Sequence, residues 1–143
     1  MNIISAFIIF DVLILIYEIL VTVFSSFYEL SGLTKDEARF QVTSILTGTG
    51  FTTSESEKML ETKKRKRLTR DIMIISYIFN ITIISTIVTI FTSRAESHDL
   101  LRGVIISLAI VVLLILSKRI TKIRNAIDNF FLHLVKRFYN KIN

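Results

Sequence analysis

Apolar and polar positions divide the chain into three long apolar runs separated by charged segments. The runs extend from Ile3 to about Tyr28, from Ile72 to about Phe91 and from Gly103 to about Leu116, and none of them contains Lys or Arg. An amphipathic helix of a soluble domain would instead place charged residues on one face every turn or two. Each run therefore predicts a helix that crosses a membrane.

The lengths of the runs agree with this interpretation. As a helix that rises about 1.5 Å per residue, the roughly 26 residues of the first run are longer than the roughly 30 Å of a hydrocarbon core. The alternative for this run is a signal peptide, but the run has neither a basic start nor a small-residue cleavage site. The third run is short, but Lys118 and Arg119 at its end can extend their charges to the headgroups. We expect an all-α integral membrane protein with three transmembrane helices.

The distribution of basic residues predicts the orientation. Residues 1–34 contain no Lys or Arg, 35–70 contain nine, 92–102 contain two and 118–143 contain seven, which together are the 18 of the chain. Cytoplasmic loops are enriched in Lys and Arg. We therefore expect a multi-pass protein of the cell membrane with its N-terminus outside and its C-terminus in the cytoplasm. The four expected segments are a first transmembrane helix (1–30), a cytoplasmic helix, glycine turn and basic segment (31–70), a transmembrane hairpin (71–117) and a basic amphipathic tail (118–143).

A polar stripe runs along the first expected helix. At 100° per residue, five polar residues project within about 40° of one another: Asp11, Glu18, Thr22, Ser25 and Glu29. Because a carboxylate near the middle of a bilayer costs at least about 2.5 kcal/mol, two on one face imply shelter from lipid. One interpretation is that the stripe lines a water-filled cleft or a path for a cation or proton, along Asp11, Glu18 and Thr22. In the other, Asp11 lies near the outer headgroups, while Glu18 carries a proton or bonds a hydroxyl of a neighbouring helix.

The second expected helix carries polar residues on two opposite faces. Ser76 and Asn80 share one face, and Asn80 is a further candidate for the ion path. The other face holds four hydroxyls, those of Thr82, Ser85, Thr86 and Thr89. Such groups commonly mediate close packing between membrane helices. Protein contact on both faces predicts a homo-oligomer.

The segment from Ser31 to Arg70 contains two helix starts. Thr34 with Glu37 forms a capping box for a helix that ends at about Leu46, and Ser54 with Glu57 forms another. The second helix is expected to continue through the basic run into the membrane. Between the two lies a turn of candidate functional residues: Thr47, Gly48, Thr49, Gly50 and Phe51. It is either a cytoplasmic turn or a re-entrant loop.

This turn resembles the pore loops of the Trk and Ktr potassium transporters, in which a short helix precedes a Thr- and Gly-rich strand. The resemblance implies that backbone carbonyls replace the water around an ion. Those pore loops enter the membrane from outside, whereas the basic residues from Lys63 to Arg70 favour the cytoplasmic side for this segment.

A longer run, 38–53, is similar to the membrane portion of bacterial proteins that carry a cytosolic TrkA-C domain. Glu55 and Glu57, which follow it, belong to the same resemblance. The resemblance implies an association with potassium transport and a small regulatory TrkA-C module. Because the sequence stops at Asn143 without such a module, we expect either a truncated relative or a cytosolic TrkA-C-type partner in trans.

Two basic segments predict contact with a lipid bilayer that has anionic headgroups. The residues concerned are Lys63, Lys64, Arg65, Lys66, Arg67, Lys118, Arg119 and Lys122. From Lys118 onward, apolar residues recur every three or four positions, which favours an amphipathic helix in the cytoplasmic interface over one that pairs with its own copy. We expect no nucleic-acid partner, since no aromatic residue interrupts the first basic run.

Composition excludes several kinds of chemistry. The chain has no Cys and two His among 143 residues, so thiolate metal sites, cysteine nucleophiles and His-rich clusters are excluded. A metal site built from carboxylates alone is not excluded by composition. We find no catalytic constellation, and we expect neither an enzyme nor a cofactor or metal. Two hypotheses follow: a membrane component or relative of a bacterial potassium-transport system, and a non-transporting membrane scaffold or regulator that binds lipid or a cytosolic TrkA-C-type partner.

Overall fold

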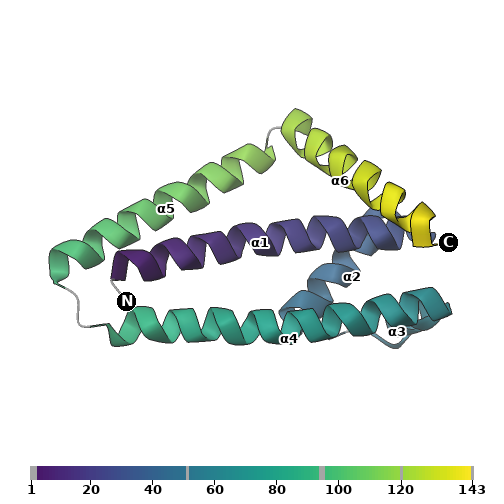
Figure 1. Ribbon diagram of the computed structural model, residues 1–143, viewed down its shortest axis with the longest axis horizontal. Helices are drawn as coiled ribbons and strands as arrows, with labels where there is room; N and C mark the ends of the chain where they lie inside the picture. Colours follow the sequence, from purple (N-terminus) through teal and green to yellow (C-terminus); the bar gives the residue numbers. More distant parts are fainter. Residues whose placement is uncertain (1–2, 51, 94–95, 120, 143) are drawn as a thin grey trace. The chain divides into compact units, whose positions relative to one another are not determined.

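The described part of the chain is mostly helical, with short turns between the helices. The computed structural model describes residues 3–50, 52–93, 96–119 and 121–142, and it describes their side chains except at 53, 117–119, 121–125 and 138–142. These residues form six helices and no strand, so the all-α prediction is confirmed for them (Figure 1). The helices are α1 (Ile3–Leu30), α2 (Lys35–Thr47), α3 (Thr53–Leu60), α4 (Lys63–Thr92), α5 (Ser97–Arg119) and α6 (Thr121–Ile142).

Three of the described helices contain stretches long and apolar enough to cross a membrane. These candidate spans are Ile3–Leu30, Lys63–Thr92 and Ser97–Leu116. They include the three apolar runs of the sequence, and each helix extends beyond its run. The extension is largest in α4, which begins at Lys63, nine residues before the apolar run at Ile72. The basic residues are therefore part of the same helix as the second apolar run.

One expected helix start lies at a different residue. Thr52, not Ser54, is the N-cap of α3, and its backbone N–H donates to the Glu55 carboxylate over 3.0 Å. Both Thr52 with Glu55 and Ser54 with Glu57 match the capping-box spacing, but Thr52 is the residue with the extended backbone that a cap requires. The expectation of one helix from here into the membrane is also wrong, because α3 ends at Leu60 and α4 starts separately at Lys63.

The start and end of α2 follow the sequence closely. The Thr34 side chain accepts from the Glu37 backbone N–H and the Glu37 carboxylate accepts from the Thr34 backbone N–H, so the expected capping box is present. At the other end, Gly48 has a φ of 70°, the left-handed conformation that commonly terminates helices. Its N–H donates to the carbonyls of Ile45 and Ser44.

The chain forms two compact units. Unit 1 consists of residues 1–18 and 81–126, and unit 2 consists of residues 19–80 and 127–143. In unit 1 the first half of α1 packs against α5, and Phe7 lies directly over Gly103. The core of unit 2 contains fully buried side chains from α1, α2, α3 and α4: Tyr28, Val42, Leu46, Met59 and Ile72. Tyr28 also shares a hydrogen bond of 2.6 Å with Thr69 of α4.

Candidate functional site

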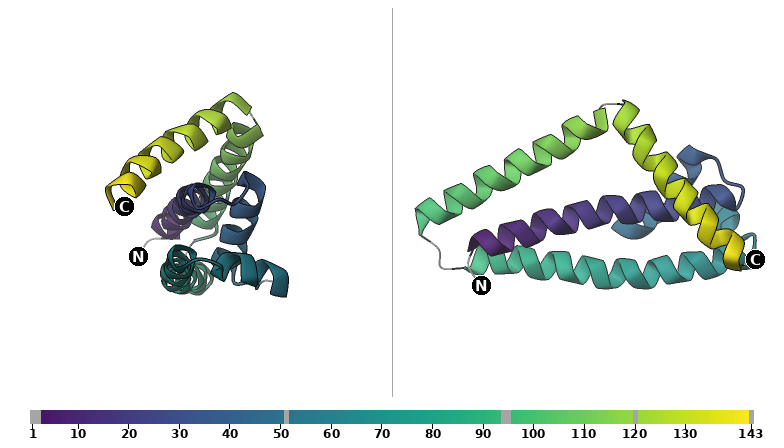
Figure 2. Two further views of the ribbon diagram at one scale, coloured as in Figure 1. Left: turned by 90° about the vertical axis from the view of Figure 1, so that its right-hand side faces the viewer. Right: turned by 45° about the horizontal axis from the view of Figure 1, so that its top comes forward.

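The C-terminal end of α2 is fixed to α4 within unit 2. The Ser76 hydroxyl is 3.0 Å from the carbonyl oxygen of Ile45 and 3.1 Å from that of Leu46, and it can donate to either. The Asn80 side-chain amide donates to the Leu46 carbonyl over 3.1 Å. Figure 2 shows α2 lying against the second half of α1 and the first half of α4. The polar face of α4 that the sequence indicated is therefore occupied by the end of α2.

This attachment lies inside the apolar part of α4. The apolar run begins at Ile72, and Ser76 and Asn80 follow it by about one and two helical turns, at about 3.6 residues per turn. The chain leaves α1 at Leu30, and α2 then carries it to Ser76 and Asn80 in the apolar run of α4. After the turn, α3 leads the chain back to Lys63, the basic start of α4.

The four residues that follow this attachment, Thr47–Gly50, make up what we call the TGTG turn. Thr47 donates its hydroxyl to the Thr43 carbonyl over 2.8 Å, and Gly50 adopts a φ of 84°. All four residues are exposed. Within the part of the chain that the structure describes, their carbonyl oxygens accept no hydrogen bond. Phe51, the fifth residue of the expected turn, lies outside the described residues.

The TGTG turn is chemically suited to a cation. A helix C-terminus carries a partial negative charge, and α2 has no basic residue in its last turn to offset it. Among the described residues, no group of three or more His, Asp or Glu side chains could hold a metal ion. The turn itself offers exposed oxygen atoms, namely its backbone carbonyls and the hydroxyls of Thr47 and Thr49.

The residues of the expected ion path have different surroundings. Asp11, in unit 1, is 3% exposed, and its Oδ1 accepts from the Ser107 hydroxyl over 2.7 Å. Its Oδ2 has no hydrogen-bond partner among the described residues. Glu18 also belongs to unit 1, whereas Thr22 and Asn80 belong to unit 2.

Whether this stripe conducts ions stays a prediction. Ser107 was not singled out from the sequence, although it is the one hydroxyl in the third apolar run and could have been noticed for that reason.

A second polar region of unit 2 was not expected. Its cavity of about 40 Å³, which we call the polar cavity, is lined by Thr22, Ser25, Ser26, Glu29, Lys35, Arg39, Asp128, Asn129 and Leu132. Asp128 of α6 lies 2.8 Å from the Lys35 ammonium and 3.9 Å from the Arg39 guanidinium. Asp128 is the only acidic residue of the basic tail. This isolated negative charge is the sequence signal that could have indicated a basic partner for Asp128.

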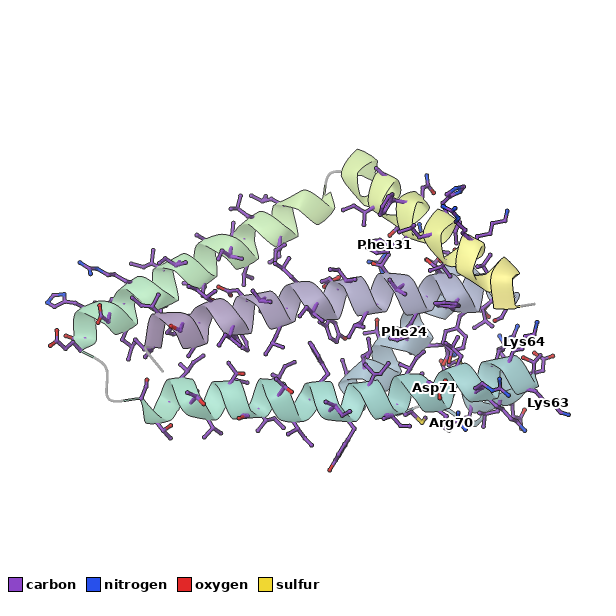
Figure 3. All side chains as sticks on the ribbon, in the orientation of Figure 1. Phe24, Lys63, Lys64, Arg70, Asp71 and Phe131 are labelled. Atoms are coloured by element: carbon purple, nitrogen blue, oxygen red, sulfur yellow. The ribbon has the colours of Figure 1, made fainter. Side chains whose placement is uncertain are left out.

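The basic residues at the start of α4 lie in two different environments. Four of them are exposed: Lys63, Lys64, Lys66 and Arg67. Figure 3 shows Lys63 and Lys64 at the N-terminal end of α4. Arg65, by contrast, is only 7% exposed.

The Arg65 guanidinium donates to the Ser31 carbonyl over 2.7 Å and to the Lys58 carbonyl over 3.0 Å, and it pairs with Glu61. Its donors therefore bond a carbonyl just after α1 and one near the end of α3. The side chains of Lys118, Arg119 and Lys122 lie outside the described residues.

An ion pair on the exposed surface connects α2 to α3. The Lys58 ammonium donates to the Glu37 carboxylate over 2.7 Å. This bond, together with the bonds from Thr34, lowers the pKa of Glu37 to about 2, and Glu37 in turn raises the pKa of Lys58.

Comparison with known proteins gives no relative: no family model, curated protein or solved structure matches the chain.

Proposed function

We propose that the protein is a membrane component of a cation-transport system, in which α2 and the TGTG turn form a re-entrant element that contacts the cation. One observation carries the proposal: the end of α2 is bonded to Ser76 and Asn80, inside the apolar run of α4. This contact favours the re-entrant interpretation of the turn over an exposed cytoplasmic one. The resemblance to Trk and Ktr pore loops suggests potassium as the cation.

The unpaired carbonyls of the turn support this function. Backbone polar groups without partners are tolerated at membrane depth only where they are buried in protein or line a water-filled cavity. The carbonyls of Thr47–Gly50 accept no bond from the described residues, and nothing lies within 4 Å of a Cβ built on Gly48 or Gly50. Carbonyl oxygens in such a position can replace part of the water shell of a cation.

The proposed site needs more than one copy of the chain. One turn approaches a cation from one side, whereas selective filters surround the ion with several loops. We therefore propose a homo-oligomer in the cell membrane with the C-terminus in the cytoplasm, as the positive residues favour. A cytosolic TrkA-C-type protein would then meet the complex on that side.

The alternative function is a membrane scaffold or regulator that transports nothing. Four exposed basic residues at the start of α4 favour this candidate, because they can contact anionic headgroups at about 1 kcal/mol each. In this case α2 would serve packing alone. Binding of a soluble TrkA-C protein that depends on Gly48 and Gly50 is expected, and finding no such partner would count against this candidate.

Potassium flux into vesicles that contain the purified protein distinguishes the two functions. Gly50→Ala strains a backbone position with a φ of 84° where the added methyl meets nothing, so its effect is confined to the turn. The matched control is Gly32→Ala, which imposes the same kind of strain at a φ of 101° after α1. We expect at least a tenfold loss of flux in the first variant and a smaller loss in the second.

Absence of flux in the parent protein, or equal losses in the two variants, contradicts the transport proposal. A separate variant, Glu18→Gln, tests the polar stripe of α1. If Glu18→Gln leaves flux unchanged while Gly50→Ala abolishes it, the TGTG turn contacts the cation and the carboxylate of the stripe is dispensable.

A further inference from the structure

The polar cavity of unit 2 combines both signs of charge in a small volume. Its carboxylates are Glu29 and Asp128, its cations are Lys35 and Arg39, and hydroxyls of the last turns of α1 complete it. The volume of about 40 Å³ exceeds the roughly 10–15 Å³ that a water molecule needs. The cavity therefore has room for a polar group about the size of a water molecule or an ammonium ion.

Ser25 places a buried hydroxyl in the wall of this cavity. The residue is only 5% exposed, and its buried hydroxyl has no hydrogen-bond partner among the described residues. The neighbouring Ser26 differs, since its hydroxyl donates to the Thr22 carbonyl over 3.0 Å. Buried hydroxyls are normally paired. The Ser25 hydroxyl therefore requires a ligand atom or a water in the cavity.

The two carboxylates of the cavity differ in their ion pairs. Asp128 is paired with Lys35 and lies near Arg39, whereas Glu29 makes no ion pair within the described part of the chain. The side chains of Lys35 and Arg39 are 51% and 35% exposed, so they can be reached from outside. An unpaired carboxylate beside a buried hydroxyl suits a cationic donor, and two accessible cations suit an anion.

We propose that the polar cavity binds the headgroup of a phospholipid that carries both a phosphate and a primary ammonium group, as phosphatidylethanolamine does. The ammonium would donate to Glu29 and Ser25, and the phosphate would accept from the remaining N–H groups of Lys35 and Arg39, whose contacts with Asp128 are kept. The site lies at the end of an apolar helix long enough to cross a membrane, where headgroups are expected. This inference goes beyond the proposed function and does not depend on transport.

Two related headgroups should fit less well. A choline headgroup has the same phosphate, but its quaternary nitrogen has no N–H to donate to Glu29 or Ser25. A glycerol headgroup has the phosphate without the ammonium and leaves Glu29 uncompensated. The expected order of affinity is therefore ethanolamine first, with choline and glycerol both weaker.

Native mass spectrometry of the full chain, released from nanodiscs with acyl-matched lipids, measures this order. We expect the ethanolamine lipid to be bound at least ten times more tightly than the choline or glycerol lipid. Glu29→Gln should remove this preference, whereas Glu57→Gln, an exposed carboxylate of α3, should keep it. Equal binding of the three lipids, or an unchanged preference in Glu29→Gln, would overturn the proposal.

Two further measurements identify the bound chemistry and its source. Ser25→Val fills the cavity without changing its charge and should reduce ethanolamine binding about tenfold, so the test does not depend on one variant. Soluble phosphoethanolamine should displace the lipid only at much higher concentration, because it lacks the acyl chains. Tight binding of phosphoethanolamine without binding of the lipid, or tightest binding of the glycerol lipid, would refute a lipid ammonium group as the ligand.

Discussion

At the scale of single residues, one hydroxyl determines how a carboxylate is held in unit 1. Ser107 donates to the buried Asp11 carboxylate, whose other oxygen has no partner among the described residues. Ser107→Ala should therefore destabilise the protein by about 1–3 kcal/mol, the cost of leaving a buried polar group unpaired. Unfolding in mixed micelles with increasing denaturing detergent measures this difference.

Replacing both partners separates packing from function at this site. The double variant Asp11→Leu with Ser107→Ala should be close to the parent in stability, because no polar group is left unpaired. If it retains stability but loses cation flux, Asp11 acts in transport. A double variant as unstable as Ser107→Ala would show that the hydrogen bond is not the main contribution of this pair.

Neighbouring residues of one type can differ completely in role. The sequence assigns Arg65 and Arg67 equally to lipid contact, since nothing in the basic run distinguishes them. The fold places Arg65 facing the ends of α1 and α3 and leaves Arg67 exposed. A run of charges fixes the charge of a segment, but the side that each residue faces depends on the helices packed around it.

At the scale of elements, α2 is connected to α3 by a pH-sensitive ion pair. The pKa of Glu37 is lowered from 4.5 to about 2 in the folded chain, mainly by the bond from Lys58. A lowered carboxyl pKa contributes stability above the unfolded value, and this contribution disappears as the pH falls from 4.5 towards 2.

The stability difference between the parent and Glu37→Gln should therefore be constant just above pH 4.5 and shrink below it. Chemical unfolding of both proteins at a series of pH values measures the difference. Glu57→Gln, an exposed carboxylate of α3, serves as the control. A difference that does not change between pH 4.5 and 2 would contradict the assigned contact.

Unit 1 depends on a close approach of α1 to α5. A Cβ added at Gly103 would lie 2.7 Å from Cε2 of Phe7, which is too short for packed carbon atoms. Gly103→Ala should therefore destabilise the protein by about 1–3 kcal/mol through overpacking, despite the higher helix propensity of Ala. Thermal unfolding measured by circular dichroism provides the comparison.

A compensating change tests the same contact. Phe7→Leu replaces the ring with a smaller side chain. Combined with Gly103→Ala, it should recover part of the stability lost in Gly103→Ala, because substitutions of residues in contact have non-additive effects. Strictly additive effects of the two substitutions would show that the Phe7 ring does not limit this position.

At the scale of the whole molecule, the orientation in the membrane is open to a direct test. We expect a cysteine at Ser97 to react with a membrane-impermeant thiol reagent added outside intact cells, and a cysteine at Thr53 to be protected. The chain contains no cysteine of its own, so each label reports one position. Labelling at Thr53 from outside would reverse the orientation and place the TGTG turn on the outer side, as in the pore loops it resembles.

The sequence predicted the local features because they depend on neighbouring residues. The three apolar runs, the capping box of Thr34 and the glycine turn after α2 all follow from periodicity and backbone preferences. It misplaced the start of α3, because two overlapping capping boxes satisfy the same spacing. Local signals of equal strength cannot choose between such alternatives.

The sequence by itself determined which segments are apolar, where positive charge accumulates and where the backbone turns, because composition and periodicity act locally. Only the tertiary structure decided which polar groups meet. It paired Asp11 with Ser107, placed the end of α2 on Ser76 and Asn80, and brought Asp128 to Lys35. These partners are tens of residues apart, and their contacts depend on the packing of whole helices rather than on any local pattern.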